Sequence, residues 1–97
     1  MIIVHSVFVC KPGNASKAAK MVKEAMAADP HMVNILTDMT GQFHRAVMVS
    51  QYEDLAAYEK SLEDMKNPTP EIKAAMAKME GFNEMYETGS REIYKVW

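Results

Sequence analysis

The sequence predicts an α+β fold in which two helical crossovers connect the strands of one four-stranded antiparallel sheet. Segments with the continuous or alternating apolar character of strands are separated by segments with the three-to-four-residue apolar spacing of helices. Their order along the chain is β-α-β-β-α-β, the split βαβ or ferredoxin-like arrangement. At 97 residues the chain has the size of a single domain. We therefore expect residues 1–97 to form one domain.

The first strand and the first helix are indicated by the N-terminal third of the chain. Residues Ile2–Cys10 are almost continuously apolar and rich in β-branched side chains, which is typical of a buried strand. The following "KPGN" fits a type II turn, because Gly13 tolerates a positive φ. Asn14 or Ser16 can then cap a helix, and Pro30 ends it.

A hairpin is predicted in the middle of the chain. Residues Met32–Asp38 alternate like a half-buried strand, and "MTGQ" provides a short turn in which Gly41 suits the left-handed conformation. A third strand is predicted over Phe43–Gln51. Right-handed crossovers then place the first and third strands at the centre of the sheet.

Two further helices and a last strand complete the chain. The second helix follows from apolar residues three or four positions apart, namely Leu55, Tyr58, Leu62 and Met65. Thr69 is the expected N-cap of an additional helix that begins with Pro70. Gly81 and Gly89 punctuate the segment that follows, and "REIYKVW" predicts the fourth strand over residues 91–97.

The predicted strands carry apolar side chains on both faces of the sheet. In each strand, alternate residues point to opposite faces. The first strand has Val4 and Phe8 on one face and Ile3, Val7 and Val9 on the other. The third strand likewise divides Val47 and Val49 from Ala46 and Met48, and the fourth divides Ile93 and Trp97 from Tyr94 and Val96. One layer of helices can cover only one face. Each large apolar side chain left in water forgoes about 1.5–3 kcal/mol. We therefore predict a homodimer in which two sheets pack face to face.

Composition excludes several classes of partner and location. The net charge is −2, and no basic stripe is interleaved with aromatic residues, so we expect no nucleic-acid partner. No segment has the length and apolar character of a signal peptide or a membrane span, so we expect no membrane association. The single cysteine, Cys10, cannot form an internal disulfide, and a cytoplasmic location is expected. The ten methionines fit either a flexible core or an adaptable apolar cavity.

Three stretches carry a resemblance to a known superfamily. "VFVCKPGNASK", "LTDMTGQFHRAVMVSQYEDLAAYEK" and the ending "GSREIYKVW" resemble the NIPSNAP-like branch of the dimeric α+β barrel proteins. The resemblance covers nearly the whole chain and implies a ferredoxin-like protomer and a dimeric barrel. Activities in that superfamily range from cofactor-free oxygenation of polycyclic substrates to haem degradation. Its haem-degrading members place a histidine on the later helical segment, and residues Glu71–Glu87 contain none, which counts against a haem role.

The histidines His5, His31 and His44 are the main candidates for chemistry. Their spacing forms no metal-binding motif, so neither a metal nor a cofactor is expected. His31, between the first helix and the second strand, is predicted to be a surface residue. His5, on the first strand, is either a satisfied, partly buried side chain or a group that lines a cavity.

His44 and Arg45 are adjacent at the start of the predicted third strand, so their side chains should point to opposite faces. A bulge near Gly41 would be needed to bring them together. We expect His44 to share a face with Met48, and Arg45 to pair with an acidic residue such as Asp38 near the sheet edge. Cys10 is not expected to be reactive.

These observations leave several functions open. The first is a homodimeric α+β barrel protein that binds a small apolar or aromatic molecule in a cavity beside the sheet. The expected ligand contacts are His5, Asn34, His44, Met48 and Tyr94. The second is an enzyme on the same scaffold, a cofactor-independent monooxygenase or an isomerase-type catalyst with His5 or His44 as general base. The third is a structural protein whose sheet face serves only for assembly.

Overall fold

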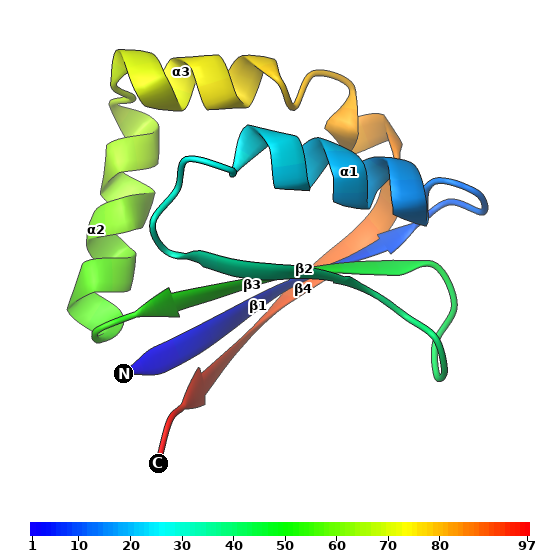
Figure 1. The fold of residues 1–97 in the computed structure, drawn as a ribbon, viewed down its shortest axis with the longest axis horizontal. Coiled ribbons are helices and arrows are strands. Elements are labelled where there is room, and N and C mark those ends of the chain that lie inside the picture. Colours follow the sequence, from blue (N-terminus) through cyan, green and yellow to red (C-terminus); the bar gives the residue numbers. More distant parts are fainter.

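The computed structural model describes all residues from 1 to 97 and confirms the predicted order of elements (Figure 1). An extra helix and one turn of 3-10 helix widen the second crossover. The elements are β1 (Ile2–Cys10), α1 (Ala15–Ala25), β2 (Met32–Thr37), β3 (Arg45–Tyr52), α2 (Leu55–Lys66), α3 (Pro70–Ala77), η1 (Phe82–Glu84) and β4 (Tyr86–Lys95).

The strands form one antiparallel sheet in the order β2-β3-β1-β4, so β1 and β3 lie at its centre as predicted. Val4 is opposite Ser50 on β3 and opposite Ile93 on β4. Because side chains alternate along each strand, this register puts the even-numbered residues of β1 and β3 on the same face. Helix α1 lies over that face, α3 lies farther from the sheet, and α2 rises from the end of β3 to join α3 (Figure 1).

The buried core between α1 and the sheet combines small side chains with one large ring. Ala18 and Val22 of α1 pack in one cluster with Cys10 of β1, Ala46 of β3 and Phe82. The alanines let the helix approach the sheet closely, and Ala18 has no exposed surface. A second cluster joins the start of β1 to α2 and consists of Ile2, Val4, Tyr52 and Tyr58.

Helices α2 and α3 begin at capping side chains. Asp54 accepts a hydrogen bond from the Ala57 N–H at 2.8 Å, and Thr69 accepts one from the Ile72 N–H at 3.3 Å. The predicted Thr69 cap with Pro70 as the first helical residue is therefore confirmed. Helix α3 has no buried residue, so packing holds it far less firmly than it holds α1.

Several strand boundaries differ from the prediction. β4 begins at Tyr86 and not at Arg91, so Gly89 lies inside the strand. A Cβ atom at position 89 would lie 3.1 Å from the Val7 carbonyl oxygen, which explains a glycine there. The strand ends at Lys95, and Trp97 lies beyond it, fully exposed.

The hairpin also differs in detail. β3 begins at Arg45 rather than Phe43, because His44 has a φ of 64° and interrupts the extended chain. β2 ends at Thr37 rather than Asp38. The predicted left-handed conformation of Gly41 is confirmed, with a φ of 88°. At the start of α1, Asn14 occupies the N-cap position without a side-chain hydrogen bond.

The sheet face opposite the helices is apolar at its centre. Val7 and Val49 are buried there even without a covering layer, and Leu36 and Tyr94 are 45% and 48% exposed. The prediction of apolar residues on both faces is therefore confirmed. We call this surface the open face; its remaining apolar members are Ile3, Val9 and Val47. None of the helices has the length and hydropathy needed to cross a membrane.

Candidate ligand cavity between the helices and the sheet

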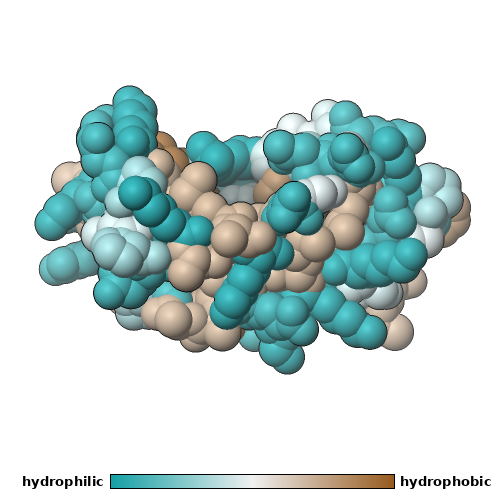
Figure 2. All heavy atoms as spheres, turned by 90° about the horizontal axis from the view of Figure 1, so that it is seen from above, coloured by the Kyte–Doolittle hydropathy of each residue, from teal (hydrophilic) through white to brown (hydrophobic).

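A hollow with a volume of about 480 Å³ lies between the sheet, the C-terminal end of α1, α2 and α3. Viewed from the α3 side, apolar atoms are exposed among hydrophilic side chains near the middle of the molecule, beside a hollow (Figure 2). Large apolar side chains supply much of the lining, namely Met26, Met48, Leu62, Met65, Ile72 and Met76. We call this hollow the helix-side cavity.

Strands β1, β3 and β4 provide the floor of the helix-side cavity. Met48, Ser6 and Arg91 form one row across the sheet, because Ser6 is opposite both of the others. Ser50, which is 5% exposed, belongs to the neighbouring row with Val4. All five residues line the cavity, so the floor offers hydroxyl groups between apolar side chains.

Aromatic rings line one side of the cavity in a continuous series. The ring of His31 stacks on Tyr52 with a centroid distance of 4.4 Å, and Tyr52 meets Tyr58 edge-on at 5.1 Å. The guanidinium of Arg91 lies 5.8 Å from the Tyr58 ring centroid, within the usual range of a cation–π contact. Residues of the sheet, α2 and the turn before β2 thus meet around one hollow.

The tyrosine at the centre of this series stays protonated at neutral pH. Burial raises the pKa of the Tyr58 hydroxyl above its ordinary value and is the largest of three effects. The positive charge of Arg91 lowers this pKa by a smaller amount, and the neighbouring Tyr52 raises it slightly. A neutral phenol both donates and accepts a hydrogen bond. Tyr58 can therefore pair with either type of polar group on a ligand.

His31 corrects one prediction from the sequence. It was expected on the surface, but it is half-buried, stacked on Tyr52, and lines the helix-side cavity. Its Nδ1 atom lies 3.2 Å from the carbonyl oxygen of Gln51. The sequence could not predict this position, because the ring packs on β3, which is distant from His31 along the chain.

The structure separates the residues predicted to contact a ligand. Met48 lines the helix-side cavity. His5, Asn34 and Tyr94 project from the open face, where the His5 and Tyr94 rings are 5.1 Å apart and His5 Nδ1 lies 4.0 Å from a Glu92 carboxylate oxygen. A role for them, or for His44, in ligand binding or catalysis stays a prediction.

His44 lies outside both sheet faces. It is exposed in the turn before β3, with its ring 5.9 Å from that of Phe43. The expected common face with Met48 is wrong, because the left-handed backbone at position 44 takes the residue out of the strand.

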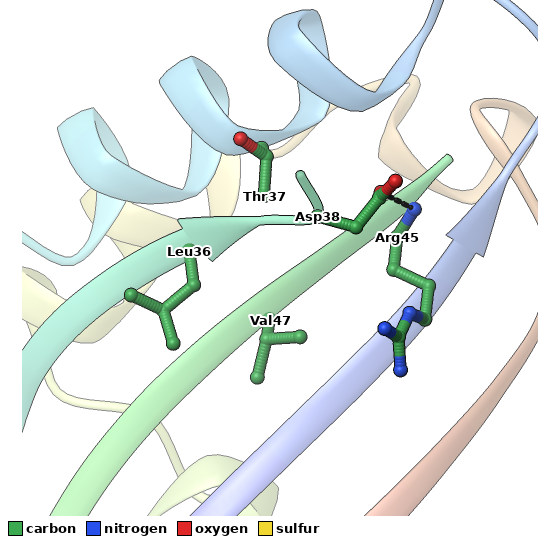
Figure 3. Close-up of a pocket in the computed structure, with 5 residues that line it drawn as sticks. All are labelled: Leu36, Thr37, Asp38, Arg45 and Val47. Carbon is green, nitrogen blue, oxygen red and sulfur yellow. Dashed lines mark hydrogen bonds between the residues drawn. The ribbon is translucent and has the colours of Figure 1, made fainter. Parts of the chain in front are cut away.

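A smaller hollow of about 170 Å³ lies at the edge of the open face (Figure 3). Asp38 lies there beside Arg45, but the predicted ion pair is corrected: the carboxylate accepts a hydrogen bond from the backbone N–H of Arg45 at 2.6 Å. The Arg45 side chain runs along the sheet with Leu36 and Val47, while Thr37 points to the opposite face (Figure 3). The Nε atom of Arg45 is buried without a partner.

Comparison with known proteins gives similarities of fold. No protein-family model and no curated protein matches the chain. A NIPSNAP domain protein from Burkholderia xenovorans superposes with a TM-score of 0.78 at 12% identity, over 100% of this chain and 95% of that one. A NIPSNAP family protein from Agrobacterium tumefaciens gives 0.77 at 12% identity, over 97% of this chain and 90% of that one.

A proposed antibiotic biosynthesis monooxygenase from Nitrosomonas europaea gives a TM-score of 0.62 at 16% identity, over 99% of this chain and 98% of that one. These identities establish a shared fold only. The resemblance inferred from the sequence is thereby confirmed at the level of fold: the chain is folded like the NIPSNAP domain proteins.

Proposed function

We propose that the protein binds a small apolar or aromatic molecule in the helix-side cavity. The observation that carries the proposal is the cavity itself, whose 480 Å³ fall within the range of about 300–1,000 Å³ usual for small-molecule sites. Its lining combines apolar side chains with a few convergent polar groups, which is the usual composition of such sites. The methionines in the lining can adjust their shape to the ligand.

Filling the cavity tests the proposal. Ala75 of α3 lines the cavity, whereas its neighbour Ala74 is exposed and does not. The neutral two-ring fluorophore N-phenyl-1-naphthylamine serves as probe, because its emission rises in apolar sites. We expect wild type and Ala74→Trp to bind it with equal affinity, and Ala75→Trp to bind it at least tenfold more weakly.

Equal unfolding temperatures of the two tryptophan variants would show that loss of binding is local. If Ala75→Trp binds the probe as tightly as Ala74→Trp does, the cavity is not the site and the proposal fails. Native mass spectrometry of the protein purified from its own host would then report which molecule, if any, accompanies it.

We further propose that a second copy of the chain covers the open face. The support is an apolar centre, Val7, Val47 and Val49, with Leu36 and Tyr94 beside it and no helix over it. A large exposed apolar patch is rare in soluble monomers and usually marks an interface. A two-fold pairing brings identical apolar centres together, and this surface is the same on both copies.

An enzymatic role is the second candidate function, and a single observation favours it: the cavity contains a histidine that has one ring nitrogen free of protein partners. Imidazole is the commonest general base in enzymes. Oxygen uptake with a polycyclic phenol would test for cofactor-independent oxygenation. We expect any turnover to fall in His31→Phe; a fall in His5→Ala or His44→Ala instead would move the catalytic centre away from the cavity.

A further inference from the structure

We propose that the ligand of the helix-side cavity carries a hydroxyl group, and that this hydroxyl donates a hydrogen bond to Nε2 of His31. The inference rests on the proposed function, because it assumes that an apolar or aromatic molecule enters the cavity. It adds the chemical class of that molecule: a hydroxylated ring, of which a phenol is the simplest example.

The ring of His31 is fixed on two sides. One face stacks on Tyr52 with an interplanar angle of 22°, and Nδ1 lies 3.2 Å from the carbonyl oxygen of Gln51. Stacking fixes the plane of the ring, and the contact with Gln51 fixes its rotation within that plane. Nε2, on the other side of the ring from Nδ1, therefore has a defined direction.

The backbone of His31 is held as firmly as its ring. Its carbonyl accepts a hydrogen bond from the Gln51 N–H at 2.8 Å, and its own N–H donates to the Asp29 carboxylate at 2.9 Å. His31 and Gln51 are thus joined twice, once through the backbone and once through the side chain. Such double fixation removes the rotamer freedom that a ligand would otherwise have to restrict.

The contact with Gln51 also assigns the tautomer. A carbonyl oxygen can only accept, so the hydrogen bond at Nδ1 requires the proton to be on that atom. In the neutral imidazole, Nε2 then carries a lone pair and no hydrogen. The ring therefore presents an acceptor with fixed position and direction, and this arrangement is the one that orients histidines in other sites.

The protein leaves this acceptor without a partner. The side chain of His31 makes its hydrogen bond through Nδ1, and the residue lines the cavity. A ligand in the cavity can therefore supply the partner of Nε2, and that partner must be a donor. An O–H group provides the shortest and most directional donor of an otherwise apolar ring compound.

Charge around the cavity favours a neutral donor over an anion. Asp29, Asp64 and Glu71 are lining residues, and Arg91 is the one cation among them. This excess of carboxylates disfavours a ligand that carries its own carboxylate or a phosphate. A neutral hydroxyl meets no such repulsion, so a phenol-like group fits the charge of the cavity lining better than an acidic group does.

A set of matched probes tests the inference. We would measure the binding of 2-naphthol, 2-methoxynaphthalene and naphthalene by equilibrium dialysis; the three share one ring system, and only the first donates a hydrogen bond. Wild type should bind 2-naphthol about fivefold to tenfold more tightly than the other two, as expected for one hydrogen bond. Equal affinity for all three probes would overturn the inference.

Two variants separate the roles of the ring nitrogens. His31→Asn keeps a donor near the position of Nδ1 but has no counterpart of Nε2, whereas His31→Gln places its amide near the position of Nε2. We expect the preference for 2-naphthol to disappear in His31→Asn and to persist in part in His31→Gln. If His31 has only a structural role, both variants should bind all three probes more weakly and by the same factor. A preference for 2-naphthol that is retained in His31→Asn would also overturn the inference.

The failure of this inference and that of the proposed function give different results. If the cavity binds no apolar molecule, none of the three naphthalenes binds and the Ala75→Trp substitution has no effect. If the cavity binds apolar molecules but His31 does not favour a hydroxyl group, wild type should bind all three naphthalenes with equal affinity. Ala75→Trp should then lose the binding of all three.

Discussion

At the scale of single residues, Cys10 shows how burial determines chemistry. It is 2% exposed, in the cluster formed with Ala18 and Val22. Burial raises the pKa of its thiol, and a contact with the backbone of Ala46 lowers it by a smaller amount. Since the thiolate is the reactive form, the native protein should react slowly with thiol reagents at neutral pH.

This shift of the pKa makes stability depend on alkaline pH. The folded thiol keeps its proton at pH values where the unfolded chain has already released it, above the ordinary cysteine pKa of about 8.5. The unfolded state then binds fewer protons, so the free energy of unfolding falls as the pH rises. We expect urea titrations to show this fall from about pH 8 to pH 10, and a weaker pH dependence in Cys10→Ala. An unchanged slope in that variant would contradict the assignment.

At the same scale, the sequence predicted some site residues better than others. Met48 could be placed on the face opposite Val47 and Val49, because the alternation along one strand determines its direction. His31 could not be placed, since its environment depends on Gln51 and Tyr52 of another strand. His44 was misplaced because its left-handed backbone takes it out of the strand, and positive φ is uncommon in residues other than glycine.

At the scale of elements, the cap of α3 was predicted from the sequence, because it depends on the adjacent residues Thr69 and Pro70. The limits of β4 were not. From the sequence, Gly89 was interpreted as a break in the chain. In the structure it lies inside β4, where a side chain would crowd the Val7 carbonyl oxygen of the adjacent strand. A glycine required by a long-range contact cannot be distinguished, in one sequence, from a glycine required by a turn.

The N-cap of α2 gives a prediction at this scale. Asp54→Ala removes the acceptor of the Ala57 N–H and should lower the free energy of unfolding by about 1 kcal/mol. Glu53→Ala is the matched control, since Glu53 is also exposed and acidic but caps nothing. Urea unfolding followed by circular dichroism measures both. Equal losses in the two variants would show that charge, and not the cap, stabilises this end of the helix.

At the scale of the whole molecule, the open face predicts self-association. Sedimentation equilibrium of wild type should give twice the protomer mass of 10.9 kDa. Val47→Lys places a charge on the open face and should yield a folded monomer, because in the single chain this position is half-buried on a face that no helix covers. Met39→Lys makes the same chemical change in the hairpin turn, where residue 39 is 96% exposed, and should stay dimeric.

A monomeric wild type at micromolar concentration would contradict the pairing of open faces, as would a dimeric Val47→Lys.

The sequence could predict the doubly apolar sheet, because alternation along a strand is local. It predicted a cavity beside the sheet but not most of its lining, because the walls come from segments far apart in the chain, between Val4 and Arg91.

The weak packing of α3 has a kinetic consequence. A wall without buried residues can separate from the rest while the sheet remains intact, so the amide protons of residues 71–77 in α3 should exchange with solvent much faster than those of β1. A bound aromatic ring would contact Ile72 and Met76 and should slow exchange in α3 selectively. Hydrogen–deuterium exchange with and without 2-naphthol measures this, and protection spread evenly over the chain would contradict it. The stability of one short helix would then set the rate at which the cavity admits and releases its ligand.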